Sequence, residues 1–194
     1  NTIDAVLIGS SPVYPYYAAP KIWGDYGITT YPLSTNLQRP KAAVHLIEEA
    51  EKTQSPSLYV FEMRMYLAAD EDLTRNMAYT RGVTDNMKYS WNRIKTINDL
   101  VDKDKEEKRY TYYFDIFKYH SNWKTMIMPS QLVTFRYSNK NPLKGHFISD
   151  EVGPSQTADF SYVTDRMPIP ADEEQVLREL LDYLKAHGKN ALFI

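Results

Sequence analysis

The chain has 194 residues and a formal net charge of −2, and its 43% hydrophobic and 25% charged residues are ordinary for one globular domain. The near-neutral charge gives no electrostatic reason to expect nucleic acid or an anionic membrane surface as a partner, and no stretch approaches the ~20 apolar residues that span a bilayer. Cysteine is absent, which excludes disulfides, thiolate catalysis and cysteine-based metal sites.

Apolar runs alternate with helical patterns through the first third of the chain. The runs at 3–8, 28–33 and 58–67 predict strands, the first of them buried on both faces. The segments at 20–26 and 39–52 predict helices, and the second of these is clearly amphipathic.

Glycine and proline mark the expected ends of these elements. Gly9 ends the first strand, Gly27 closes the first helix, and Pro32 marks the end of the second strand. Further along the chain, Gly188 is the expected cap of the last helix.

The middle of the chain predicts a helical insertion over about 70–137, with helices at 89–101 and 106–123. The segment at about 138–170 holds four prolines and little periodicity, so it predicts an irregular excursion that serves as a lid or rim. The last helix is predicted at 171–187. Its apolar stripe consists of Val176, Leu177, Leu180, Leu181 and Leu184.

Strands that alternate with helices predict right-handed crossovers and a mostly parallel sheet of at least four strands, the first of them internal. The expected strands are at 4–9, 28–33, 57–65 and 190–194. The whole chain, 1–194, is interpreted as a single α/β domain. Because it opens at Asn1 without methionine and stops on an apolar run, we expect truncation at both ends, with the last run in the sheet.

The strongest local feature is the Gly9-Ser10-Ser11 turn directly after the first strand. The carboxyl ends of parallel strands are where α/β folds present catalytic groups, so Ser11 is a candidate nucleophile. Gly9 permits a sharp turn whose backbone N–H groups can face an oxyanion. The alternative is an ordinary polar exit from a strand, because such short motifs are weak signals.

The loop after the second strand holds Ser34 and Asn36. A backbone N–H of this loop and the Asn36 side chain are candidates to complete an oxyanion hole beside Ser11. The alternative is that Asn36 or Thr35 caps the following helix.

Other titratable side chains offer fewer candidates. Glu62 and Arg64, near the end of the third strand, form either a cleft ion pair or a solvated strand end. Among the four histidines, His120 is the candidate to reach an active site, and a hydrogen-bonded structural histidine is the alternative. No carboxylate or histidine cluster has metal-ligand spacing, so neither a metal nor another cofactor is expected.

Short blocks of the sequence resemble a known enzyme family. The block Asp4-Ala-Val-Leu-Ile-Gly-Ser-Ser11, followed by Trp23-Gly-Asp-Tyr-Gly-Ile-Thr-Thr-Tyr31, is similar to the first block of the SGNH (GDSL-like) hydrolases. In particular, it resembles their divergent, usually membrane-anchored bacterial branch, which includes D-alanyl-lipoteichoic acid transfer proteins. The segment Tyr113-Phe-Asp-Ile-Phe-Lys-Tyr-His-Ser-Asn-Trp123 also looks like that branch.

The resemblance implies a flavodoxin-like three-layer α/β/α sandwich with Ser11 as the nucleophile. It also implies an extracytoplasmic protein, membrane-anchored or secreted. The sequence departs from the family pattern in two blocks: the glycine of the second block falls near Ser34, and the Gly-x-Asn-Asp block is missing at 62–70. The acid and base, from an Asp-x-x-His block, are expected downstream of Ile194, so the 194 residues alone are expected to be inactive.

Two functions remain as hypotheses. The first is a serine esterase or acyl transferase acting on acyl groups of cell-envelope polymers or on a small molecule, with Ser11 as nucleophile. Backbone N–H groups near Ser11 and Ser34, with Asn36, would hold the oxyanion. The second is a non-catalytic relative that holds a cell-surface glycan or peptide in a tyrosine-rich cleft. No nucleic-acid partner is expected, and membrane contact is expected only through an anchor removed before Asn1.

Overall fold

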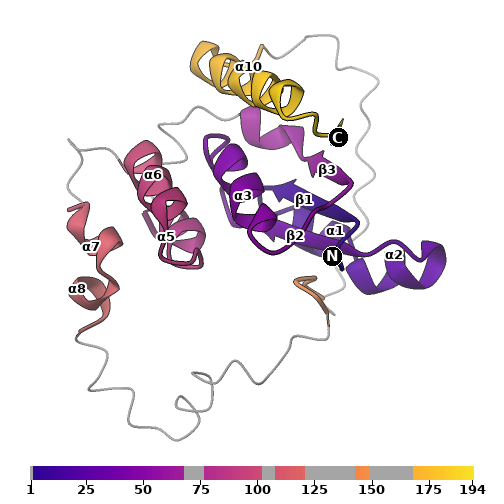
Figure 1. Cartoon of the computed structure of the whole chain (residues 1–194), viewed down its shortest axis with the longest axis horizontal. Helices are drawn as coiled ribbons and strands as arrows, with labels where there is room; N and C mark the ends of the chain where they lie inside the picture. Colours follow the sequence, from indigo (N-terminus) through magenta and orange to yellow (C-terminus); the bar gives the residue numbers. More distant parts are fainter. Residues whose placement is uncertain (1, 68–76, 102–107, 121–142, 149–167) are drawn as a thin grey trace, which may run out of the picture.

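The computed structural model describes residues 2–67, 77–101, 108–120, 143–148 and 168–194 (Figure 1). Within them, four strands form one sheet: β1 (Ala5–Gly9), β2 (Thr30–Ser34), β3 (Leu58–Phe61) and β4 (Ala191–Phe193). The helices are α1 (Val13–Tyr16), α2 (Ala19–Tyr26), α3 (Ala42–Glu51), the 3₁₀ helix η1 (Met63–Tyr66), α5 (Met77–Thr84), α6 (Trp91–Leu100), α7 (Tyr110–Tyr113), α8 (Asp115–Tyr119) and α10 (Ala171–Ala186).

The sheet is parallel throughout, with the strand order β2-β1-β3-β4. β1 lies inside it, and all five of its residues are buried, because helices and turns cover both faces of this strand. The predicted parallel sheet with an internal first strand is confirmed. The run predicted at 190–194 is likewise in the sheet, where β4 pairs with β3.

Two predicted strand ends are wrong. Pro32 lies inside β2. It is tolerated there because β2 is an edge strand of the described sheet, so on one side it has no neighbouring strand that would need a backbone N–H donor. β3 ends at Phe61, short of the predicted range, because the next residues form η1. Met65 and Tyr66 of η1 are buried, so the apolar residues that prolonged the strand pattern enter the core from a helix.

The sheet separates two apolar clusters. On one face, Ile8 and Phe61 pack in a core to which α3 and α10 contribute. On the other face, Leu7 and Val60 pack against Val13 of α1. Successive residues of a strand point to opposite faces, so each strand supplies both clusters. The result is an α/β protein consistent with a three-layer α/β/α arrangement.

One helix of the predicted insertion, α6, lies against α3. His45 of α3 is hydrogen-bonded to Asp99 of α6 (Nε2 to Oδ2, 2.7 Å), and its other ring nitrogen lies 3.3 Å from Asn92 Oδ1. α7 and α8 lie beyond α5 and α6, at the opposite end of the molecule from α2 (Figure 1). The single helix predicted at 106–123 is wrong, because extended backbone at Phe114 (φ −127°) separates α7 from α8. The predicted excursion lies mostly outside the described residues.

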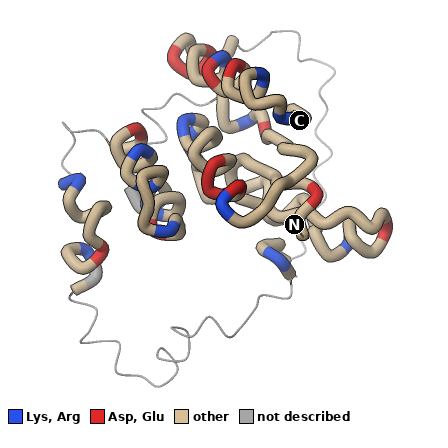
Figure 2. The backbone as a smooth tube through the Cα atoms, in the orientation of Figure 1, with Lys and Arg blue, Asp and Glu red and all other residues tan. Residues whose placement is uncertain are grey.

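α10 covers the core with a narrower apolar stripe than predicted. Leu180 and Leu184 are buried, but Leu181 is 43% exposed, so its assignment to the stripe is wrong. Acidic and basic residues are spread along the length of this helix (Figure 2). Gly188, at φ 59°, follows the helix in the left-handed conformation expected of its cap.

The neighbouring leucines of α10 provide a matched test of this packing. Leu180→Ala should lower the free energy of unfolding by about 2–5 kcal/mol, because it leaves a cavity against the sheet. Leu181→Ala, in the same helical turn, should change it by less than about 1 kcal/mol. Urea denaturation of the two variants measures the difference, and equal losses would contradict the described orientation of α10.

Candidate functional site

The sequence-predicted site residues lie at one edge of the sheet. β1 ends at Gly9, which pairs with Ser34 at the end of β2, and the adjacent β3 ends at Phe61. The chain leaves these ends in loops that carry Ser11 and Asn36. Because the strands are parallel, the three loops start from the same edge. The carboxyl edge therefore holds all three residues expected there.

Glu62, the first residue after β3, bridges this strand to β1. Its Oε2 accepts hydrogen bonds from both the backbone N–H (3.0 Å) and the hydroxyl (2.8 Å) of Ser10. Glu62 and Ser10 are each 8% exposed, so the predicted solvated strand end is wrong. The alternative ion pair with Arg64 is wrong too, because Arg64 is exposed and forms no ion pair with Glu62.

Glycine is required at position 9 by the close approach of these two strand ends. A Cβ added there would lie 2.4 Å from Glu62 Cβ and 2.6 Å from Val13 Cγ2. Both distances are shorter than real Cβ atoms tolerate, and Val13 is buried against the sheet and unable to move freely. Gly9 therefore allows Glu62 to reach Ser10.

Ser11 differs from Ser10 in having no such partner. It is half-buried, and among the described residues neither its hydroxyl nor its backbone N–H forms a hydrogen bond. The chain turns directly after it, since Val13 N donates to Ser10 O (3.1 Å) and α1 begins. Ser11 is thus held at a tight turn with its polar groups available.

The loop after β2 also has unused polar groups. The hydroxyls of Ser34 and Thr35 are buried and lack a hydrogen-bond partner in the described part of the chain. Asn36 is exposed, and its Oδ1 accepts a hydrogen bond from the hydroxyl of Tyr14 on α1. This contact fixes the amide orientation and leaves Nδ2 as a donor. Neither Thr35 nor Asn36 caps α3, whose N-cap is Lys41, so that alternative is wrong.

None of the four histidines, all of which are described, hydrogen-bonds to Ser11. His120 is exposed at the end of α8 with its Nδ1 3.1 Å from Phe117 O, so no contact brings it to the carboxyl edge. The histidine that approaches the edge is His146, whose Nδ1 lies 2.7 Å from Tyr14 O. No periodicity or motif around His146 could have indicated this position.

Comparisons with known proteins return nothing: no family model, no curated protein and no solved structure matches the chain. Within the described ranges, no group of three or more histidine, aspartate or glutamate side chains could hold a metal ion. No described helix has both the length and the apolar character needed to cross a membrane. A function for the carboxyl edge is therefore inferred from its geometry and from the family-like sequence blocks at 4–11, 23–31 and 113–123.

Two glycines provide opposite tests of the close approach. Gly9→Ala should lower the free energy of unfolding by about 1–3 kcal/mol, because the new methyl group overlaps Glu62 and Val13. Gly24→Ala is the control, because a Cβ at Gly24 meets nothing within 4 Å and the residue lies inside α2. There alanine should stabilise by about 0.5–1 kcal/mol. Thermal or urea unfolding distinguishes the signs, and a stabilising Gly9→Ala would refute the described contact.

Proposed function

We propose that the protein is an SGNH-type serine esterase or acyl transferase that acts on acyl groups of cell-envelope polymers, with Ser11 as its nucleophile. The observation that carries the proposal is the division of roles between adjacent serines. The Ser10 hydroxyl is held by Glu62, whereas the Ser11 hydroxyl at the same strand end has no partner among the described residues. A nucleophile must be positioned yet free to react, and Ser11 meets both conditions.

The topology supports a flavodoxin-like version of the fold. The described strand order β2-β1-β3-β4 coincides with the first four positions of the flavodoxin-like order 2-1-3-4-5. In such sheets ligands bind at the carboxyl ends of the strands beside the switch point between the first and third strands. The Ser10–Glu62 hydrogen bonds join these two strand ends.

In the proposed reaction, Ser11 Oγ attacks the acyl carbonyl carbon and transfers its proton to a general base. The tetrahedral oxyanion accepts hydrogen bonds from the Ser11 N–H, the Ser34–Asn36 loop and the Asn36 Nδ2 group, which the Tyr14 contact orients. When the tetrahedral intermediate collapses, the alcohol part of the substrate leaves and takes up the proton from the general base. The acyl group remains on Ser11 as an ester. Water then releases the acid in an esterase, or a second hydroxyl or amine takes the acyl group in a transferase.

A non-catalytic relative that binds a cell-surface glycan or peptide is the second candidate. It is favoured by one observation: Ser11 has no histidine at hydrogen-bond distance. The general base of the SGNH family comes from an Asp-x-x-His block, and the 194 residues contain no such spacing. Activity that depends on Ser11 separates the two candidates.

Ser11→Ala in the full-length natural protein should lower kcat/KM for a short-chain acyl ester by at least about 10³-fold, because the acyl-enzyme cannot form. Ser57→Ala is the control, since Ser57 is exposed just before the amino end of β3 and should leave kcat/KM unchanged. Ser10→Ala should mainly reduce stability. Activity that survives Ser11→Ala but disappears in Ser10→Ala would move the nucleophile to Ser10.

Asn36→Asp tests the oxyanion donor separately. Aspartate keeps an acceptor for the Tyr14 hydroxyl but replaces the donating amide by a negatively charged oxygen, which opposes an oxyanion. We expect kcat to fall by about 10²-fold or more with little change in KM. Asn190→Asp alters an amide that lies beside Ser57, near the amino end of β3, and serves as control. Unchanged kcat in Asn36→Asp would exclude this residue from the oxyanion hole.

A further inference from the structure

Large apolar side chains gather on the outer surface of α6, α7 and α8. We define the aromatic patch as Tyr89, Trp91, Ile94, Tyr110, Phe114, Ile116 and Phe117, all of them exposed. Trp91 is 78% exposed and Ile116 70%. Exposed apolar groups of this number, on adjacent elements, mark interaction surfaces in folded proteins.

Apart from Ile116, for which no contact with the other patch residues is shown, the patch is continuous. Tyr89, Trp91, Ile94 and Phe114 line one cavity of about 560 Å³ between α6 and the end of α7. Phe117 extends it, because its ring packs edge-on against Phe114 (centroids 6.0 Å apart) and Tyr110 (5.2 Å).

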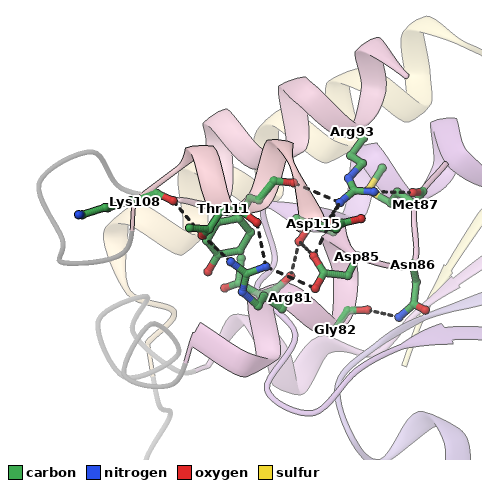
Figure 3. A network of polar contacts seen from close by, with 12 residues as sticks. Arg81, Gly82, Asp85, Asn86, Met87, Arg93, Lys108, Thr111 and Asp115 are labelled. Carbon is green, nitrogen blue, oxygen red and sulfur yellow. Dashed lines mark hydrogen bonds and ion pairs between the residues drawn. The ribbon is translucent and has the colours of Figure 1, made fainter. Parts of the chain in front are cut away.

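A buried polar network connects the helices that carry these rings (Figure 3). The guanidinium of Arg93, which is 2% exposed, donates to Asp115 Oδ1 (2.6 Å), Tyr112 O (3.1 Å) and Met87 O (3.3 Å). It also lies over the ring of Tyr89 at 4.3 Å, and the Tyr89 hydroxyl donates to Asp115 (2.8 Å). The network joins α6 to α7 and α8, so the exposed rings form a preformed surface.

The charged groups around the patch favour an anionic partner. Among the residues that the structure describes, the acidic side chain in contact with the patch is Asp115, which is already paired with Arg93 and Tyr89. Lys95 is exposed and lies one helical turn after Trp91, on the same side of α6. Lys108 is exposed too, with its Nζ 6.0 Å from the Tyr110 ring centroid. The basic segment that contains Lys108 lies at the start of α7 (Figure 2).

We propose that the aromatic patch is the surface through which the protein lies on an anionic phospholipid membrane. Trp91, Phe114 and Ile116 would enter the boundary between headgroups and acyl chains, and Lys95 and Lys108 would contact the lipid phosphates. Protein surfaces that lie at a membrane interface typically combine exposed aromatic and aliphatic side chains with lysines around them. The near-neutral net charge of the whole chain gave no reason to expect this partner, because a net charge does not show how charged residues are distributed over the surface. The proposal does not depend on Ser11.

A second copy of the chain is a less suitable occupant. In a two-fold dimer the same patch lies on both sides of the interface, so the positive charges of Lys95 and Lys108 would be brought to a surface that carries the same positive charges. Like charges at the rim of an interface disfavour association. An anionic lipid surface has no such penalty.

Vesicle co-sedimentation tests the proposal, with phosphatidylcholine vesicles that contain or lack phosphatidylglycerol. The protein should bind the anionic vesicles, and added salt should weaken binding. Trp91→Ala combined with Phe114→Ala should reduce binding at least about tenfold, because two inserted rings are lost. Lys95→Glu combined with Lys108→Glu should reduce binding specifically to the anionic vesicles. Trp23→Ala is the matched control: this tryptophan is also exposed (57%) but lies on α2, away from the patch.

Several outcomes would overturn the proposal. They are the absence of binding to anionic vesicles, equal binding by the patch double variant and by Trp23→Ala, and a concentration-dependent dimer that Trp91→Ala dissolves. Urea unfolding of each variant shows whether it is folded. Because Trp91 and Phe114 are exposed, their replacement should leave the unfolding midpoint nearly unchanged.

Discussion

The hydrogen bonds from Ser10 to the Glu62 carboxylate are the interaction on which the carboxyl edge depends. A carboxylate that is almost fully buried is costly unless it is well hydrogen-bonded, and here one oxygen accepts both polar hydrogens of a single residue. The contact needs the two strand ends so close that a glycine must precede Ser10. It thereby determines which of the two adjacent serines is tied to the protein and which is available.

A similar principle organises the opposite end of the molecule. Arg93 donates hydrogen bonds to two backbone carbonyls and to the Asp115 carboxylate, and Arg81 donates to Thr111 while it stacks on Tyr112. These short helices thus hold together through arginine side chains, whose several donors in one plane suit such a junction. A small buried apolar cluster of Ile97, Val101 and Tyr112 lies beside these arginines, and the larger aromatic residues of the patch remain exposed.

The sequence predicted the parallel sheet with an internal first strand, and the main helices, because the apolar periodicity of each element is set by its own burial. Prediction from the sequence was wrong or silent where a side chain contacts a residue far away in the chain. A charged residue such as Glu62 at the end of a strand is usually solvated. Its burial is explained by the hydrogen bonds that it accepts from Ser10, a residue 52 positions earlier in the sequence. His146 reaches Tyr14 from a segment 132 residues away, and no local pattern records such a contact. The predictions for Leu181 and Phe114 were wrong because of a limit of helical periodicity. Periodicity identifies the apolar side of a helix, but it shows neither how wide that side is nor where the helix is interrupted.

The place of β4 in the sheet has a consequence for the order in which the protein assembles. β3 has one neighbour from the first residues of the chain and the other from a segment whose Asn190 bonds to Ser57, 133 residues earlier. During synthesis on the ribosome, β2, β1 and β3 with α3 can pair as soon as they emerge, whereas the second side of β3 stays open until residues 191–193 arrive. An unpaired parallel strand is a site for wrong pairing between nascent chains. Chaperone dependence should therefore be concentrated in the interval between the synthesis of β3 and that of β4.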